Sequence, residues 1–198
     1  GLVNMANGTS LRFRSAVTEF TNQISIAGTV GLGLDSLSPN TVATTLSGVI
    51  AGTGVLNIDA TDGEILLAAN NTYSGGTTIA GGAVHMGAGG TTGALGTGSI
   101  TNNGVLVFNR SNDFTFTQDM SGSGALEKRL GNTVTLTGSL SNTGNNTIGA
   151  GTLRVGAGSS VGTLGSGNII NNGTLVINRL EDITLVNAIS GTGDLSKL

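Results

Sequence analysis

The sequence offers very few residues of the types that catalyse reactions. It contains one histidine, His85, and no cysteine. Disulfide bonds and thiol catalysis are therefore excluded, and a histidine-based mechanism or a multi-histidine metal site would depend on His85 alone. His85 is the third residue after Gly82, which places it at the outward phase of an expected strand. We expect His85 to be a solvated surface residue.

Three carboxylates, Asp59, Asp62 and Glu64, lie close together in the segment NIDATDGEIL. Paired carboxylates hydrolyse glycosidic bonds, and grouped aspartates hold Ca²⁺. Both chemistries need acids that converge from neighbouring turns of the chain, and no acidic residue recurs at this phase one turn away. We expect ordinary solvated acids in a turn. Asn112 and Glu181, which stand at equivalent places in two copies of a repeat described below, are also interpreted as turn residues.

Other sequence patterns for catalysis or ligand binding are missing. The glycine run GGAVHMGAGG at residues 81–90 has neither the following helix nor the lysine of a phosphate loop. The calcium-binding pattern Gly-Gly-x-Gly-x-Asp is absent, and no Gly-x-Ser-x-Gly elbow stands between an expected strand and a helix. The sequence therefore predicts no catalytic residue, no cofactor-binding residue and no metal ligand, which argues against an enzyme.

Composition and charge exclude further classes of function. The chain has 198 residues, a formal net charge of −3, eight lysines and arginines, 35 glycines and one proline. It has no basic stripe of the kind that contacts phosphate backbones, so nucleic acid is not an expected partner. No apolar run reaches the roughly 18 residues that span a bilayer. The start has neither an initiator methionine nor a signal sequence, and we expect a segment of a longer protein.

A long internal repeat organises the chain. The phrase GALGTGSITNNGVLVFNR at residues 93–110 returns as GTLGSGNIINNGTLVINR at residues 162–179, with 12 of 18 positions identical. We expect one domain, with degenerate coils at 1–49, a first repeat at 50–119, a second at 120–188 and the start of a third at 189–198. Repeats of this kind are typical of solenoids, in which each unit stacks on its neighbours.

A shorter period lies within each repeat. A glycine followed two residues later by Val or Leu recurs at Gly28, Gly54, Gly82, Gly104, Gly124, Gly151, Gly173 and Gly193. The second and fourth positions after these glycines are mostly apolar, and alternation with period two indicates a strand with one buried face. We predict an all-β fold, a parallel β-helix of about eight or nine coils of roughly 20–28 residues, with three coils per 69-residue repeat. Leu175 and Ile177 should then lie over the core column of Leu106 and Phe108, three coils on.

Two kinds of polar residue fall at inward positions. Lys128 and Lys197 do so in successive repeats, and because an unpaired buried lysine is costly, we expect both ammonium groups to reach water at a corner. The pairs Asn102–Asn103 and Asn171–Asn172 are expected to form inward ladders, in which side-chain amides bond along the coil axis and satisfy the backbone of the turns.

Three stretches resemble a known family. NNTYSGGTTIAGGAV (residues 70–84), GALGTGSITNNGVLVFNR and SGSGALEKRLGNTVTLTG (residues 121–138) are similar to the passenger-associated transport repeat of bacterial autotransporters. The resemblance covers about residues 50–198. It implies a right-handed β-helix that is exported across the outer membrane of a Gram-negative bacterium by a C-terminal β-barrel translocator outside this segment. It also implies type V secretion and display on the cell surface or release.

The resemblance suggests a stalk or adhesin that supports host attachment or virulence. The possible partners are a host-cell surface, extracellular matrix, a glycan or a second rod of the same kind. Two alternatives stay open at this point. One is a polysaccharide-acting β-helix enzyme, and the other is a pure scaffold that presents an effector domain located upstream.

Overall fold

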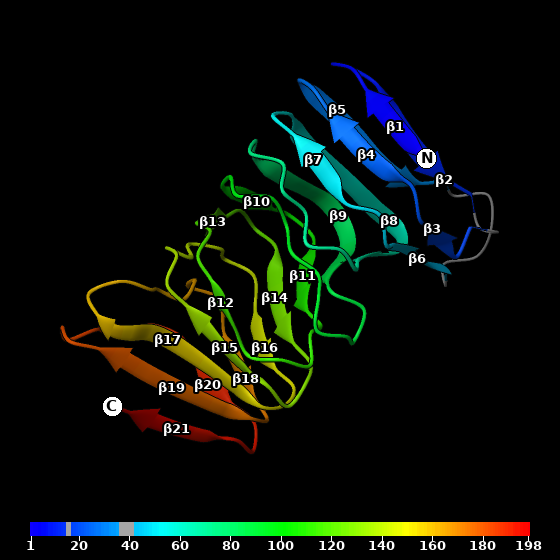
Figure 1. The fold of residues 1–198 in the computed structure, drawn as a ribbon. Coiled ribbons are helices and arrows are strands. Elements are labelled where there is room, and N and C mark those ends of the chain that lie inside the picture. The colour runs from blue at the N-terminus through cyan, green and yellow to red at the C-terminus, as the bar shows by residue number, and fades with distance from the viewer. Residues whose placement is uncertain (15–16, 36–41) are drawn as a thin grey trace.

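The computed structural model describes residues 1–14, 17–35 and 42–198, apart from the side chains of Val42 and Asp62. These residues form 21 strands and no helix, and the chain winds as stacked turns from one end of a rod to the other (Figure 1). The strand pairs of the described part are all parallel. Since these residues contain no helix, they include no helical segment that could cross a membrane.

The strands form three sheets along the sides of the turns. The main path of the 13-stranded sheet runs through β2 (Ser10–Phe13), β5 (Thr29–Leu34), β8 (Val55–Leu67), β9 (Thr77–Met86), β11 (Val105–Phe108), β14 (Ala125–Lys128), β16 (Asn146–Ile148), β18 (Ile169–Asn171) and β20 (Ile189–Ser190). Beside this path lie β3 (Glu19–Phe20), β6 (Val42–Leu46), β10 (Ile100–Asn102) and β13 (Met120–Ser121). The three-stranded sheet contains β1 (Leu2–Met5), β4 (Gln23–Ile26) and β7 (Ile50–Gly52). The five-stranded sheet contains β12 (Phe114–Phe116), β15 (Thr133–Leu136), β17 (Thr152–Ser159), β19 (Thr174–Arg179) and β21 (Asp194–Lys197).

The turns differ only modestly in length. Two residues that pair across neighbouring turns are separated in sequence by the length of one turn. This separation is among the shortest for Thr133 and Thr152 and among the longest for Ile24 and Ile50. The nine strands along the main path correspond to about nine turns. At roughly 4.8 Å per turn, they make a rod of about 40 Å. The predicted all-β fold of stacked parallel coils is confirmed.

Alternate apolar side chains fill the inside of the turns. Leu106 and Phe108 of β11 are 0% and 1% exposed, and the ring of Phe108 packs on Phe116 with centroids 5.0 Å apart. Leu175 and Ile177 of β19 are buried in the same way. Because side chains alternate across a strand, the residue between the two members of each pair has the outward phase. The inward positions predicted for these four residues are confirmed.

The two copies of the repeat do not lie over each other, however. Leu106 belongs to β11 in the 13-stranded sheet, whereas Leu175, its equivalent in the second repeat, belongs to β19 in the five-stranded sheet (Figure 1). The prediction that both lie on one core column is therefore wrong. Residues of the second repeat therefore lie one side of the rod further around than their equivalents in the first repeat, and we call this displacement the rotation of the second repeat.

Turn length explains this rotation. Thr77, Ile100, Met120 and Leu140 follow one another on successive turns. Three turns therefore carry the chain from Thr77 only to Leu140, whereas one full repeat carries it from Thr77 to its equivalent, Asn146. The expected three coils thus fall short of one repeat. The short stretch after Leu140 leads the chain on to β16, which begins at Asn146 and stacks on β14 and through it on β11.

Side-chain amides link neighbouring turns from inside the rod. Asn102 and Asn171 are 0% and 2% exposed, and each Nδ2 donates to a carbonyl oxygen of the following turn at 2.8 Å. Each Oδ1 accepts from the amide two residues later in its own turn. Asn103 and Asn172 also bond along the axis, but they are exposed. The inward ladder is confirmed for the first asparagine of each pair and wrong for the second.

Glycine is required where the backbone of one turn touches that of the next. Gly82 has φ +69°, and a Cβ atom there would lie 1.7 Å from the carbonyl oxygen of Ala60. Gly89 has a similar φ of +86° but no atom within 4 Å of the same position. The two glycines therefore separate the effect of backbone conformation from that of close packing.

Candidate functional site

The first candidate is a shallow groove on the side of the N-terminal turns, which we call the glycine groove. Gly31 and Gly33 of β5 form its floor, and side chains of β2 and β8 form its walls around a volume of about 310 Å³. Arg12 of β2 donates from Nε to Asp35 at 2.8 Å, and its Nη2 lies 3.9 Å from Asp59. The arginine at the edge of the groove is thus held by acids of this chain.

The acidic cluster predicted from the sequence is distributed along β8. Asp59 accepts hydrogen bonds from the amide and hydroxyl of Thr61, and the hydroxyl bond lowers the pKa of the Asp59 carboxyl. Asp59 and Glu64 lie in a strand that is interrupted between Ala60 and Glu64 by a register shift, and not in the expected turn. The side chain of Asp62 lies outside the described part of the chain.

The second candidate surrounds His85 on the outer face of β9. His85 is 1% exposed, which shows that the expectation of a solvated residue was wrong. Its Nε2 lies 3.4 Å from Oε2 of Glu64, and its Nδ1 lies 3.3 Å from the side-chain amide nitrogen of Asn109. His85 does have the outward phase, as does Val107 opposite it on the next turn, but Val107 is also fully buried.

An arginine, Arg129, reaches across several strands to the carboxylate beside His85. Arg129 follows β14, and its Nε lies 2.8 Å from Oε1 of Glu127. Its Nη2 lies 3.9 Å from Glu64 of β8, a strand separated from β14 by β9 and β11. We call Glu64, His85, Glu127 and Arg129 the His85 cluster. Its three charged side chains are each about one-third to two-fifths exposed.

Burial decides what the His85 cluster can do. Removal from water lowers the pKa of His85, and the neighbouring carboxylate of Glu64 opposes this shift. A neutral imidazole beside a carboxylate is an arrangement used in general base catalysis, which requires access to a substrate proton. Both ring nitrogens of His85 face protein groups, and the side chain is closed off from solvent. The arrangement therefore suits a structural link between turns.

Lys128 is the largest departure from the sequence-based expectation. It is 0% exposed, whereas we expected its ammonium group in water. Its Nζ donates to the carbonyl oxygens of Leu130 and Ala150 at 2.5 and 3.0 Å, and to Oδ1 of Asn132 at 3.2 Å. Three acceptors at the corner thus replace water, and burial lowers the pKa of Lys128 to about 8. Lys197 is exposed, as predicted.

The described residues hold no group of three or more His, Cys, Asp or Glu side chains placed to bind a metal ion. The side of the rod instead presents open depressions, of which the glycine groove is one, and two others are lined mainly by polar atoms. Such surfaces provide hydrogen bonds and charges for contact with another molecule.

Comparison with known proteins gives one informative match. No family model matches the chain, and no solved structure matches it. The adhesin BmaC autotransporter of Brucella suis biovar 1 (strain 1330) is 38% identical over an alignment of 168 positions, and the alignment covers 73% of this chain. The matched region is 5% of the length of that protein.

Three observations agree on the identity of the chain. The repeats resemble those of autotransporter passengers, the described residues form a parallel β-solenoid, and the chain is similar to an autotransporter. The protein is thus located on the surface of a Gram-negative bacterium or released from it after export across the outer membrane. The chain belongs to the autotransporters, as a segment of a β-helical passenger.

Proposed function

We propose that this segment is an adhesive stalk, which holds the passenger away from the bacterium and makes weak, repeated contacts with a host surface. The observation that carries this proposal is the 38% identity to an autotransporter named as an adhesin. The geometry supports it, because the described turns stack into a rod (Figure 1), and many of the exposed residues on its sides are Ser, Thr or Asn. Several weak contacts made by one rod bind more tightly together than any of them alone.

The proposal assigns no catalytic role to the segment. Glycoside hydrolysis needs two carboxylates that face a substrate across a cleft. Asp59 is held by Thr61 and lies near Arg12, and Glu64 contacts His85 and Arg129. These acids are therefore engaged in contacts within the rod, three of which link different turns, and this supports adhesion over polysaccharide cleavage.

A replacement experiment separates adhesion from spacing. Residues 50–188 are replaced, in the full-length protein, by an equal number of turns from an unrelated β-helix, and attachment of the bacteria to cultured host cells is counted. We expect attachment to fall at least tenfold while surface display, measured with an antibody against another part of the passenger, is unchanged. Unchanged attachment would show that the segment is only a spacer for a domain elsewhere.

A further inference from the structure

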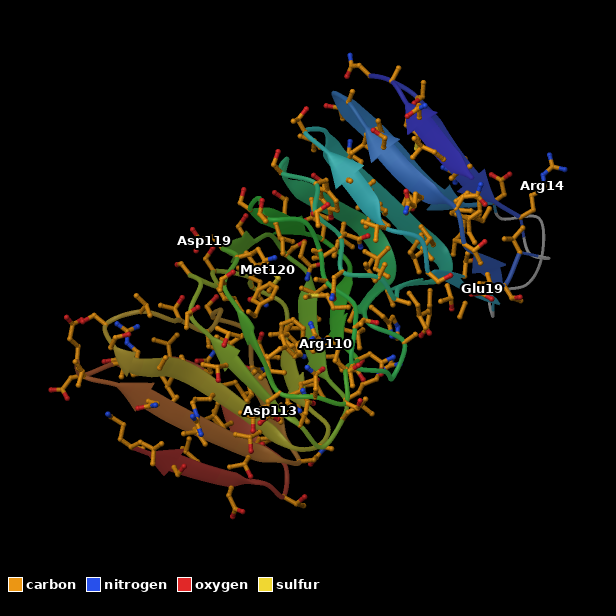
Figure 2. All side chains as sticks on the ribbon, viewed as in Figure 1. Arg14, Glu19, Arg110, Asp113, Asp119 and Met120 are labelled. Carbon is orange, nitrogen blue, oxygen red and sulfur yellow. The ribbon has the colours of Figure 1, made fainter. Side chains whose placement is uncertain are left out.

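A polar depression lies where the second repeat stacks on the first. Thr115 of β12, Thr135 of β15 and Arg154 of β17 follow one another on successive turns and share the outward phase. Asp113 and Thr133 lie beside them, and Oδ1 of Asp113 accepts from the amide of Thr133 at 2.7 Å. With Phe114, these residues enclose about 270 Å³, which we call the junction depression. Figure 2 labels Asp113 on this side of the rod.

Arg154 is the unusual residue of the junction depression. It forms no hydrogen bond or ion pair with any residue that the structure describes, and its Nε is buried without a partner. By contrast, Arg12, Arg129 and Arg179 each lie within 4 Å of a carboxylate. A guanidinium has five N–H donors, and leaving a buried donor unpaired is costly. Arg154 is therefore a cation without an anionic partner among the residues that the structure describes.

The junction depression exists because the second repeat is rotated relative to the first. The equivalent of Arg154 in the first repeat is His85, whose neighbour on the preceding turn is Leu66. The neighbour of Arg154 on the preceding turn is Thr135. Because the second repeat is turned by one side of the rod, Arg154 lies against a column of threonines, whereas His85 lies beside Glu64. The depression thus belongs to the junction between repeats and not to each repeat.

We propose that the junction depression binds one carboxylate-bearing sugar unit of a glycan. The guanidinium of Arg154 pairs with the sugar carboxylate, for which its planar fork of donors is suited. The carboxylate of Asp113 accepts hydrogen bonds from sugar hydroxyls, and the threonine hydroxyls both donate and accept. This inference rests on the proposed adhesive function and names the chemistry of one contact.

Charge and size favour this ligand over others. A polyanion such as nucleic acid is bound by many cations, whereas the depression has one arginine and one aspartate among its lining residues. A bare anion gains nothing from Asp113, which repels it. The volume of about 270 Å³ is slightly below the range of roughly 300–1,000 Å³ for drug-sized ligands and suits a single sugar ring.

The test is an NMR titration of the folded 198-residue chain with four probes. They are 3′-sialyllactose, a hyaluronan tetrasaccharide, lactose and sodium sulfate. We expect saturable shifts of the Arg154 Nε–H and of the Thr115 and Thr135 amides with one or both acidic sugars, and at least tenfold weaker binding of lactose. Arg154→Ala should weaken binding about tenfold or more, and Arg14→Ala, which removes the same charge from an exposed site, should not.

Several results would overturn the inference. They are no shift with any probe, equal affinity for lactose, equal shifts with sulfate, or undiminished binding by Arg154→Ala. Thr135→Ala, which removes one hydroxyl and no charge, provides a second variant if Arg154→Ala does not give a native spectrum, and we expect it to weaken binding several-fold. If no acidic sugar binds but the replacement experiment still abolishes attachment, the junction depression is rejected as a glycan site and the adhesive function is retained.

Discussion

The buried pair Asn142 and Asn146 provides a sharp test of how the two repeats correspond. Both side chains are 0% exposed, and Oδ1 of Asn142 and Nδ2 of Asn146 have no hydrogen-bond partner. In the first repeat the same places hold Tyr73 and Thr77, whose hydroxyl oxygens are 2.8 Å apart. We predict that the double substitution Asn142→Tyr and Asn146→Thr stabilises the chain.

The structure gives the size of the effect. Each unpaired buried group costs about 1–3 kcal/mol, so removal of both gains about 4 kcal/mol. Two losses together take back about 2 kcal/mol: the imperfect fit of the larger ring, and the hydrogen bonds that Nδ2 of Asn142 donates to the Gly124 and Gly144 carbonyl oxygens and to Asn146. The ring has room, because Tyr73 lies against Gly96, and its equivalent against Asn142 is Gly165. The expected net gain of about 2 kcal/mol raises the unfolding midpoint by roughly 4–8 °C for a chain of this size.

Urea unfolding and amide hydrogen exchange measure this gain together. Exchange is needed because stacked turns can open locally, and the amide of Ser166, which donates to the carbonyl oxygen of Asn142 at 2.9 Å, reports on the altered turn. The reverse variant, Tyr73→Asn with Thr77→Asn, should lose about as much stability as the forward variant gains, or more. Destabilisation by the forward variant, with no loss in the reverse one, would refute the equivalence of the two pockets.

Three further predictions concern single side chains. Lys128→Met should lower the free energy of unfolding by about 3 kcal/mol, because one buried acceptor and two half-buried ones lose their donor; a loss below about 1 kcal/mol in urea unfolding would contradict this. The lowered pKa of His85 means that the unfolded chain binds a proton more readily, so stability present at pH 7.5 declines as the pH falls below 6.5. His85→Gln should lack this part of the decline between pH 7.5 and 5.5, and identical pH profiles would argue against it. Gly82→Ala should destabilise by more than about 3 kcal/mol through its contact with the neighbouring turn, and Gly89→Ala by about 1 kcal/mol through backbone strain alone; equal losses on thermal unfolding would show that contact is not the cause.

The turns themselves were predictable from the sequence. Residues such as Leu106 and Phe108 alternate with outward-facing ones, and that alternation fixes which face of each strand is buried. Asn102 and Asn171 follow from the same phase, since a buried amide needs a partner and the next turn supplies one. These properties depend on the order of residues within one turn, which is the information that a sequence contains most directly.

The main departures from the sequence-based predictions depend on neighbouring turns. His85 has the outward phase, but Glu64 lies beside it because β8 contains a register shift that the period does not reveal. Lys128 is buried because carbonyl oxygens of its own and the next turn surround its Nζ. The rotation of the second repeat arises because three turns are shorter than one repeat, and sequence comparison measures the length of the repeat but not that of the turn.

The rotation of the second repeat has a consequence for proteins that lengthen by duplication of a repeat. Duplication of one repeat reproduces the same core, since inward residues remain inward on whichever side they lie. It also sends each copied surface residue in a new direction and gives it new neighbours, as His85 and Arg154 show. A longer passenger built by duplication would therefore gain length without a row of identical sites, and each junction would be free to recognise something different.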